Sequence, residues 1–323
     1  MSMRRTGAGF RALPLLVLAL SAVLSLTNCE SKSARAAKLL SRAESMEETA
    51  SPDSMIALAN RVLKLDPDSY EAYDLRGRGY DDKGDRRAGI RDYGAALKLK
   101  PDFVDALDDR GTDYDFVGIF DSAVADYNRL IELQPTNTDR LLTRGLVFQE
   151  LEKYDLALAD INRVIQARPN DPDAYVYRAD VYSEMDSLSK AQLDYDRSIK
   201  LEPNRVLPYY HRGLAYLDHE LYDPAVTDFT RVTQIDSKND GAWEGLGDCY
   251  AALNKFDMAL LEYAQAMQWD STRADLWAKL GFASWQLGKN DDARRQLARA
   301  LGQRADLIGV SADSVKSWLG RIR

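Results

Sequence analysis

The sequence predicts an all-α protein built as a solenoid of short helical repeats. Prolines recur every 34 residues, and a small residue and an aromatic residue each keep their own place in that period. A period of about 20 to 50 residues is typical of stacked repeats, in which each unit buries its apolar face only against its neighbours. The evenly spaced prolines are Pro67, Pro101, Pro135, Pro169 and Pro203.

The period divides most of the chain into eight blocks without an insertion. The blocks are 36–69, 70–103, 104–137, 138–171, 172–205, 206–239, 240–273 and 274–307. The first block is degenerate, because Met55 and Ala59 stand where later blocks have an alanine and an aromatic residue. Ser237 and Ser271 replace the proline in two late blocks. Terminal repeats of a solenoid are commonly atypical in this way.

The apolar places within a block predict two helices that pack against each other. Counted from the first residue of a block, places 4, 8 and 11 lie four and three residues apart, so they share one face of a first helix. Places 20, 24 and 27 do the same for a second helix. Small residues at places 8 and 20 let the two backbones approach, while place 24 fills the interface, mostly with Tyr93, Tyr127, Tyr195, Phe229 and Tyr263.

Polar residues at place 18 are predicted to cap the second helices. Aspartate and serine are favoured N-cap residues because their side chains accept a hydrogen bond from a free backbone N–H group. The proline at place 32 is expected to end the second helix, since the residue before a proline disfavours the helical conformation. The predicted caps are Asp121, Asp155, Ser189, Asp223, Asp257 and Asp291.

These aromatic, small and proline places resemble the pattern of the tetratricopeptide repeat family. The resemblance covers residues 36–307 and implies an α-solenoid, a right-handed superhelix of helix-turn-helix repeats. It also implies that the first helices line a concave groove that binds other proteins.

Residues 308–323 are predicted to form a capping helix that covers the last repeat. Ser311 is its expected N-cap, and an amphipathic lid of this kind is what the end of a solenoid requires. The apolar face of the lid is expected to consist of Val315, Trp318, Leu319 and Ile322.

Residues 1–28 are predicted to be a lipoprotein signal peptide. Three arginines within residues 1–11 precede an apolar run over 12–26, which is shorter than the roughly 20 residues of a membrane span. The run ends in Leu26-Thr27-Asn28-Cys29, which resembles the bacterial lipobox, although Asn28 departs from the small residue usual there.

The lipobox resemblance implies that Cys29 is acylated and that residues 29–35 form a short linker to the first repeat. The protein would then be lipid-anchored in the cell envelope and face the periplasm. Glu30, in place of an aspartate, slightly favours the outer membrane. Ordinary cleavage, for example after Ser25, would instead give a secreted protein.

Places 7 and 23 predict a ladder of arginine–aspartate pairs. Both places change together in the last two blocks, where Leu246 and Leu280 replace the arginine, so the two side chains are expected to touch. We interpret the ladder as internal ion pairs, because an arginine already paired offers little to a ligand. The alternative is an anion-binding stripe. The pairs are Arg76–Asp92, Arg110–Asp126, Arg144–Asp160, Arg178–Asp194 and Arg212–Asp228.

No pattern for catalysis, cofactor binding or a metal site stands out, so we expect a protein that is not an enzyme. The two histidines, His211 and His219, have no cysteine or carboxylate at ligand spacing. The segment 113–121 matches a calcium loop poorly, because Val117 and Val124 replace two ligands. Cys249 is expected to be a small core residue.

The groove predicted from the family resemblance is acidic in early blocks and apolar in later ones. In that family the groove is lined by places 2, 5, 9, 12 and 13. The alternative is that the apolar residues pack between repeats. The acidic residues are Glu71, Asp74, Asp81, Asp82, Asp105, Asp108 and Asp115, with Arg78 as an exception; the apolar residues are Leu142, Leu146, Leu207, Tyr210, Leu214, Leu217, Phe282 and Trp285.

We therefore expect a membrane-anchored adaptor or scaffold that binds proteins or peptides with basic and apolar segments. The net charge of −8 argues against nucleic acid as a partner. The groove lacks the lysine and asparagine places with which some related proteins grip a C-terminal carboxylate. The alternative is a secreted or lipid-anchored solute- or glycan-binding protein that uses Tyr210, Phe282 and Trp285 as a stacking platform.

Overall fold

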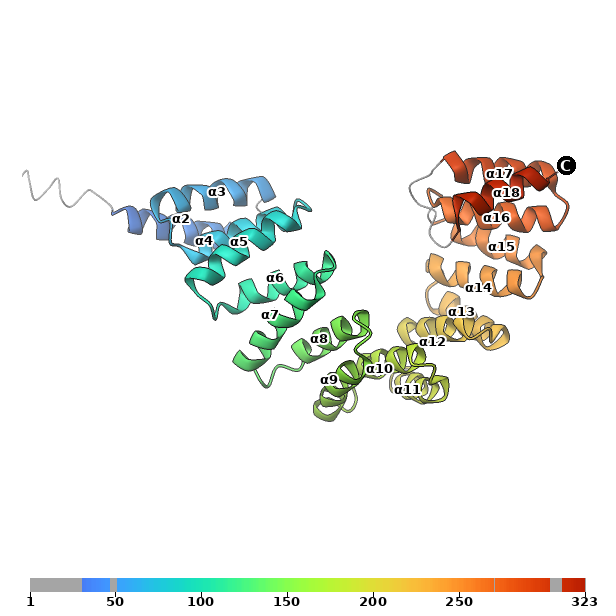
Figure 1. Ribbon diagram of the computed structural model, residues 1–323, viewed down its shortest axis with the longest axis horizontal. Helices are drawn as coiled ribbons and strands as arrows, with labels where there is room; N and C mark the ends of the chain where they lie inside the picture. The colour runs from blue at the N-terminus through green and yellow to red at the C-terminus, as the bar shows by residue number, and fades with distance from the viewer. Residues whose placement is uncertain (1–30, 47–50, 270, 303–309, 323) are drawn as a thin grey trace, which may run out of the picture. The chain divides into compact units, whose positions relative to one another are not determined.

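The computed structural model describes residues 31–46, 51–269, 271–302 and 310–322, and these ranges consist of helices joined by short turns (Figure 1). The predicted signal peptide and Cys29 lie outside these ranges. Among the helices described, none combines the length and the apolar character that a membrane crossing requires.

The chain divides into two compact units, residues 1–136 and 137–323. We call them the N-terminal unit and the C-terminal unit. The helices of the N-terminal unit are α2 (Lys32–Met46), α3 (Pro52–Leu65), α4 (Tyr70–Asp81), α5 (Arg86–Leu99), α6 (Val104–Phe116) and α7 (Phe120–Leu133).

The C-terminal unit repeats the same alternation of helices. Its members are α8 (Asp139–Glu150), α9 (Tyr154–Ala167), α10 (Pro172–Glu184), α11 (Leu188–Leu201), α12 (Val206–Asp218), α13 (Tyr222–Ile235), α14 (Asp240–Ala252), α15 (Phe256–Ala266), α16 (Ala274–Gln286), α17 (Asn290–Gly302) and α18 (Ala312–Arg321).

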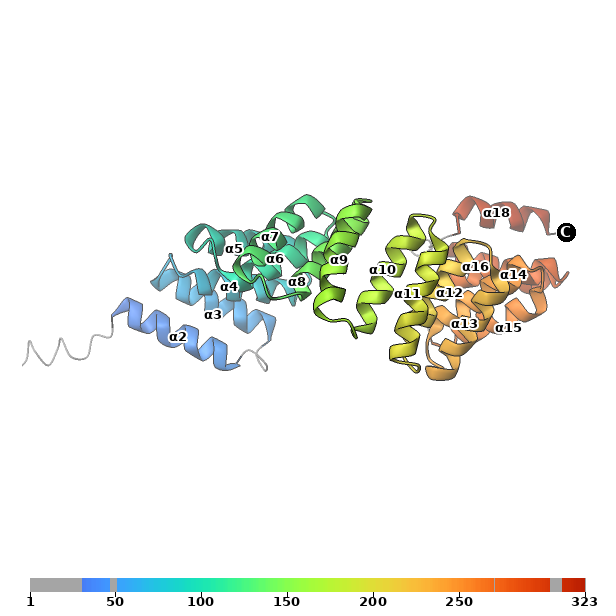
Figure 2. The same ribbon diagram turned by 90° about the horizontal axis from the view of Figure 1, so that it is seen from below.

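Within each unit, the predicted pairing of helices into a solenoid is confirmed. Each first helix packs on the second helix of its own repeat, and that second helix packs on the first helix of the next repeat. Figure 2 shows the paired helices α4 and α5 of one repeat lying side by side. The linker predicted for residues 29–35 is wrong in part, because α2 begins at Lys32. There the hydroxyl of Ser31 accepts a hydrogen bond from the Ala34 N–H (3.0 Å).

Close contact between places 8 and 24 holds the two helices of a repeat together. The place-24 rings of Tyr93, Tyr127 and Phe229 are fully buried. A Cβ atom added to Gly77 would lie 2.7 Å from the Tyr93 ring, and one added to Gly213 would lie 2.9 Å from Phe229. A larger residue at place 8 would therefore push the helices apart, which explains the small residue that recurs there.

The turn between the two helices places one residue in the left-handed region of backbone space. In the seven such turns that the structure describes, this residue is place 15, and its φ angle lies between 54° and 80°. Glycine or asparagine suits that conformation, but several repeats use a glutamate or an aspartate at a cost in local strain. The residues are Gly84, Gly118, Glu152, Asp186, Glu220, Asn254 and Gly288.

The predicted N-caps at place 18 are wrong, because the second helices begin two residues earlier. The cap lies at place 16, for example Asp85 of α5, whose carboxylate accepts from the Ala88 N–H. The left-handed residue at place 15 sets this start by turning the chain directly into the helix. Asp121 and Asp155 instead stand in the first turn, where a negative charge complements the helix dipole.

Helix α18 agrees with the predicted lid over the last repeat. The side chain of Ser311 accepts a hydrogen bond from the Ser314 N–H (3.0 Å) and so caps the helix. Val315 and Ile322 are buried against α17, and Trp318 and Leu319 pack beside them.

Candidate protein-binding surfaces

The structure brings together each of the five predicted arginine–aspartate pairs. In every pair the Nε and Nη2 atoms of the arginine donate to the two carboxylate oxygens at 2.7–2.8 Å. The aspartates are buried, with at most 7% of each exposed. Such two-pronged pairs are strong and directional. The ladder therefore belongs to the framework of the repeats, as the interpretation of internal ion pairs requires.

Two of the predicted acidic groove residues, Asp81 and Asp82, line a cavity in the N-terminal unit. We call this cavity the acidic pocket. It has a volume of about 360 Å³ and draws on four helices, α3 to α6. Sequence reasoning identified Asp81 and Asp82 but missed Asp109, which lies at place 6. The lining residues are Met55, Arg78, Asp81, Asp82, Tyr93 and Asp109.

Asp81 belongs to a compact carboxyl cluster at the floor of this pocket. The Tyr93 hydroxyl donates to Asp81 Oδ2 at 2.5 Å, and Arg86 Nη1 donates to Asp113 Oδ1 at 2.7 Å. The remaining oxygens, Asp81 Oδ1 and Asp113 Oδ2, are buried and have no hydrogen-bond partner among the described residues. A Cβ atom at Gly89 would lie 2.1 Å from Asp81 Oδ1 and 3.0 Å from Asp113 Oδ2, so glycine is required there.

Burial and mutual repulsion raise the pKa of three carboxyl groups at this pocket. Burial, followed by neighbouring acids such as Asp113, raises the pKa of Asp81 to about 7. Burial also raises the pKa of Asp109 to about 6, although the nearby Arg78 opposes the shift. Burial also raises the pKa of Asp74 to about 8, and the negative charges of Asp109 and Asp105 raise it further. These carboxyl groups therefore hold protons close to neutral pH, and a cation placed beside them would favour their ionised forms.

The prediction that Asp74 lines the groove is wrong, because the residue is buried. Only 3% of this residue is exposed, and one of its oxygens lies 3.2 Å from Arg78 Nε. It is therefore an interior residue, and burial keeps its carboxyl group protonated near neutral pH. Asp105 is exposed as predicted, whereas Glu71 and Asp108 are half-buried, and Glu71 accepts a hydrogen bond from the Ser69 hydroxyl.

The apolar residues predicted for the groove are half-buried in the C-terminal unit. Leu207 packs against the cluster around Val176 and Tyr195. Tyr210, Leu214 and Leu217 pack against the cluster around Phe229 and Leu246. Leu142 and Leu146 on α8 are also half-buried. These side chains thus contribute to packing between helices and present only part of their surface to a partner.

A polar cavity of about 240 Å³ lies among α8, α10, α11 and α12 of the C-terminal unit. Asp180 is at its centre, accepting from the Tyr195 hydroxyl at 2.6 Å and lying 2.8 Å from His211 Nδ1. Leu214 lines the same cavity. Sequence reasoning missed Asp180 and His211 as partners.

An equivalent network recurs around Asp248. It accepts from the Tyr263 hydroxyl at 2.8 Å and from Lys279 Nζ at 2.7 Å, and Lys279 also donates to Glu244 at 2.6 Å. Burial lowers the pKa of Lys279, but Asp248 and Glu244 outweigh that effect and the pKa is raised.

A signal for these networks exists in the sequence. Where place 24 has a hydroxyl, place 9 is polar, as in the pairs Tyr195 with Asp180 and Tyr263 with Asp248. After the degenerate first block, place 9 is apolar where place 24 lacks a hydroxyl: Ile161 with Leu146, Phe229 with Leu214, and Leu297 with Phe282.

The aromatic side chains expected for the alternative, glycan-binding function are half-buried in the structure. The Phe282 ring lies 4.7 Å from the Trp318 ring of α18 and 6.1 Å from the ring of Trp285. Trp285 also packs against the core beneath α18. Tyr210 makes an edge contact with Phe229 at 6.0 Å. The lid and the core thus cover part of the ring surface that a sugar would stack on, and all three side chains are half-buried.

The described part of the structure gives no support for a metal site, for the weak calcium pattern or for a reactive cysteine. In the described ranges, no three His, Cys, Asp or Glu side chains are grouped so that they could hold a metal ion. Asp113 and Asp115 of the weak calcium pattern belong to α6. Cys249 is buried, and burial raises the pKa of its thiol to about 12, which keeps it protonated and unreactive.

Comparison with known proteins agrees with the repeat architecture. The family model described as tetratricopeptide repeat matches residues 142–205 and 210–275. A tetratricopeptide repeat protein of known structure from Parabacteroides merdae is 20% identical, with 78% of this chain and 98% of that chain covered and a TM-score of 0.59. The APC/C hetero-tetramer Cut9–Hcn1 is 15% identical, with 95% and 59% covered and a TM-score of 0.57. No curated protein matches the sequence.

Proposed function

We propose that this chain, which is a tetratricopeptide repeat protein, is a membrane-anchored adaptor of the cell envelope that binds a basic segment of another protein. The fold supports a role as a scaffold for protein–protein interaction. The anchor, the periplasmic location and the basic character of the partner are our proposal.

The acidic pocket is the observation that carries the choice of partner. Burial, with neighbouring acids adding to it, raises the pKa of Asp81 to about 7 and that of Asp109 to about 6. A lysine or arginine side chain in the pocket would favour the ionised carboxylates and relieve their repulsion. The pocket volume of about 360 Å³ is large enough for such a side chain.

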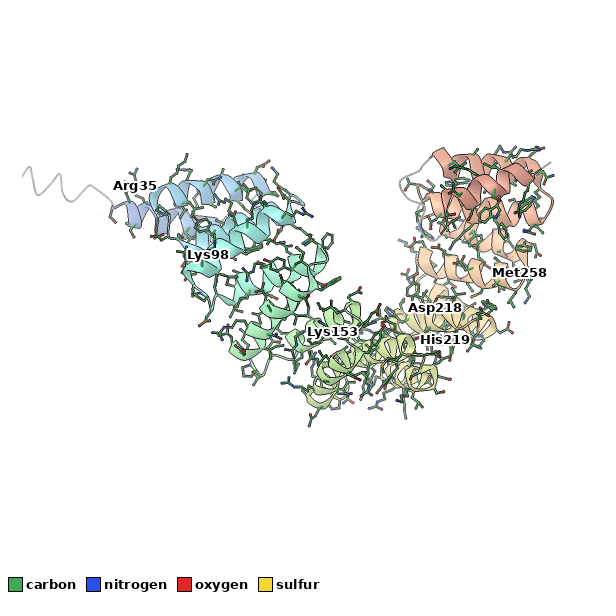
Figure 3. All side chains as sticks on the ribbon, in the orientation of Figure 1. Arg35, Lys98, Lys153, Asp218, His219 and Met258 are labelled. Carbon is green, nitrogen blue, oxygen red and sulfur yellow. The ribbon has the colours of Figure 1, made fainter. Side chains whose placement is uncertain are left out.

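The exposed basic residues of helix α2 support the proposal that the chain is held close to a lipid bilayer. The first residue of α2, Lys32, follows Cys29 by three positions in the sequence, and Arg35 is exposed on the same helix (Figure 3). Anionic lipid headgroups attract cations of this kind. A cavity of about 500 Å³ between α2 and α3 is lined by Arg35, Lys38, Leu39, Arg42, Arg61, Lys64 and Leu65.

Cross-linking of the full-length chain in its native membranes, followed by purification, tests the proposal. The wild-type chain should recover a partner whose cross-linked peptide contains lysine or arginine. The Asp81→Asn plus Asp109→Asn variant should recover at most about a tenth as much, because losing charge-assisted contacts of this type costs roughly 1.5–3 kcal/mol. In the same preparation, Cys29→Ser should move the chain from the detergent phase to the aqueous phase.

A matched control removes two exposed acids elsewhere. Asp155 and Asp257 are exposed in the first turns of α9 and α15, so Asp155→Asn plus Asp257→Asn should leave the partner unchanged. Equal recovery by the pocket variant and the control would rule out the acidic pocket as the binding site. An unchanged detergent partition of Cys29→Ser would rule out the anchor.

A further inference from the structure

The arginines of the ladder have a second set of partners that links each repeat to the one before it. Arg76 Nη1 donates to Asn60 Oδ1 at 2.7 Å, and Arg178 Nη1 donates to Asn162 Oδ1 at 2.6 Å. Arg212 Nη1 pairs in the same way with the Asp196 carboxylate. All three acceptors stand at place 25, sixteen residues before the arginine. The third donor nitrogen of the guanidinium thus normally binds a side-chain oxygen from the preceding repeat.

Arg110 lacks this second partner. Its Nε and Nη2 atoms donate to Asp126 at 2.8 and 2.7 Å, but the residue at place 25 of the preceding repeat is Gly94. Within the described part of the chain, no oxygen accepts a hydrogen bond from Arg110 Nη1. A Cβ atom at Gly94 would lie 3.6 Å from that nitrogen, so the space that an asparagine or aspartate occupies in other repeats is open here.

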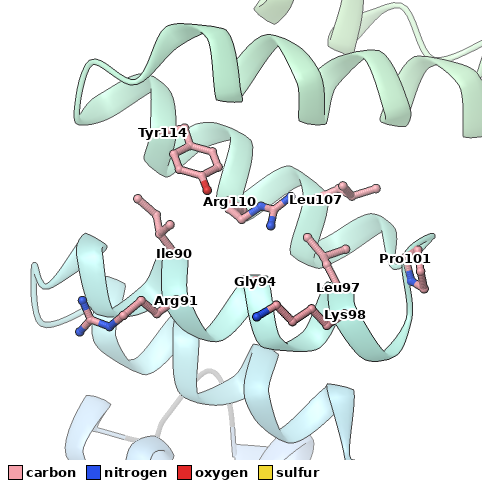
Figure 4. Close-up of a pocket in the computed structure, with 9 residues that line it drawn as sticks. All are labelled: Ile90, Arg91, Gly94, Leu97, Lys98, Pro101, Leu107, Arg110 and Tyr114. Atoms are coloured by element: carbon pink, nitrogen blue, oxygen red, sulfur yellow. The ribbon is translucent and has the colours of Figure 1, made fainter.

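The missing side chain opens a cavity of about 670 Å³ between α5 and α6. Figure 4 shows Gly94 and Lys98 of α5 facing Arg110 and Leu107 of α6 across the gap. Arg91 also lines this cavity, and none of its lining residues is acidic. Neither Arg91 nor Lys98 forms an ion pair with a described residue, in contrast to the paired arginines of the ladder. Apolar walls come from Ile90, Leu97, Pro101 and Leu107.

We propose that this cavity binds a carboxylate-bearing ligand, whose oxygen accepts the hydrogen bond from Arg110 Nη1. The Asp196 carboxylate already fills the corresponding position beside Arg212, which shows that the geometry suits this group. Lys98 and Arg91 add positive charge, and the apolar walls fit a hydrocarbon portion next to the carboxylate. The site differs from the acidic pocket in position and in charge.

This inference rests on the proposed adaptor function, because it adds a carboxylate to the chemical groups that the same adaptor would bind. A peptide ending in leucine, or one with a glutamate between leucines, has the required chemistry. A small carboxylate molecule carries the same carboxylate group without a peptide. The experiment must therefore separate these sources.

Calorimetric titration of the full-length chain with four probes provides the test. The probes are acetyl-Ala-Leu-Leu with a free carboxylate, the same peptide as an amide, acetyl-Leu-Glu-Leu-amide, and acetate. Binding of the free acid but not of the amide is expected. Binding of the glutamate peptide would assign the ligand to a side-chain carboxylate, and equal binding of acetate would assign it to a free metabolite.

Two substitutions at one position form a matched pair. Gly94→Asn supplies the side-chain oxygen that other repeats provide. This substitution should weaken binding of the free-acid peptide about tenfold to a hundredfold. Gly94→Ala gives the helix a similar residue without an oxygen and should keep the affinity within about twofold. The Asp81→Asn plus Asp109→Asn variant should bind the peptide normally, so a failure of the adaptor proposal would not be mistaken for a failure here.

Three outcomes would overturn the inference. One is the absence of binding by all four probes to the wild-type chain, and another is binding of the amide as strongly as the free acid. The third is equal affinity of the Gly94→Asn and Gly94→Ala variants for the free acid. A rise in thermal midpoint of Gly94→Asn above that of Gly94→Ala would show that asparagine engages Arg110 as intended.

Discussion

Replacing Asp74 with asparagine should remove a pH dependence of stability from the N-terminal unit. Burial raises the pKa of Asp74 in the folded chain to about 8, from 3.8 for an exposed group. Between pH 5 and pH 7 the folded state therefore keeps a proton that the unfolded state has lost. Because the folded state binds more protons, raising the pH lowers the free energy of unfolding.

The size of the effect follows from the same two values. One proton held over two pH units corresponds to about 3 kcal/mol, from roughly 1.4 kcal/mol per pKa unit. Wild-type chain should lose up to that amount between pH 5 and pH 7, and Asp81 adds to the loss, most strongly in the lower part of this range, because its folded pKa is about 7. The Asp74→Asn variant, which cannot ionise at this position, should lose about 3 kcal/mol less.

Urea unfolding followed by circular dichroism at pH 5, 6 and 7 measures this difference. Asp68→Asn is the matched control, since Asp68 is an exposed aspartate in the turn before α4. It should show the pH dependence of the wild-type chain. If the Asp74→Asn variant and the wild-type chain had the same pH dependence, or if wild-type stability rose with pH, burial of a protonated Asp74 would be refuted.

Two further substitutions test the ladder and the turn. Arg144→Leu alone should destabilise the C-terminal unit by about 3–5 kcal/mol because Asp160 stays buried without its partner, whereas Arg144→Leu plus Asp160→Leu should recover most of that loss. Thermal unfolding checks the ordering, and equal losses in both variants would contradict it. Glu152→Gly should raise the free energy of unfolding by about 1 kcal/mol because Glu152 has a φ of 54°; Asn254→Gly, at the same place in its repeat, should change it much less, and a loss in Glu152→Gly would contradict the strain.

The repeat architecture could be predicted from the sequence because its cause is local and periodic. Spacings of three and four residues put Tyr93 and Ala96 on one face of a helix wherever they recur, and the 34-residue period repeats that face. The joint change of places 7 and 23 even indicated the contact of Arg144 with Asp160. Eight copies of one pattern provide comparisons that a single copy could not.

The candidate sites could be predicted only in part, because they depend on how backbones approach. Asp74 has the sequence pattern of a groove residue, yet packing buries it, and Asp109 joins the pocket from a place that the family pattern does not assign to the groove. The left-handed residue at place 15 moved the helix start from the predicted place 18 to place 16.

The sequence by itself thus determined the helices, their pairing within a repeat and the arginine–aspartate contacts, since each follows from the spacing of residue types along one chain. Only the tertiary structure decided which charges are buried together and where a side chain is missing. The carboxyl groups of Asp81 and Asp113 meet because Gly89 has no Cβ atom to keep them apart. Arg110 faces an open cavity because Gly94 stands where other repeats have a side-chain oxygen that accepts a hydrogen bond from the arginine. Both results depend on distances between helices, which the period of a sequence does not specify.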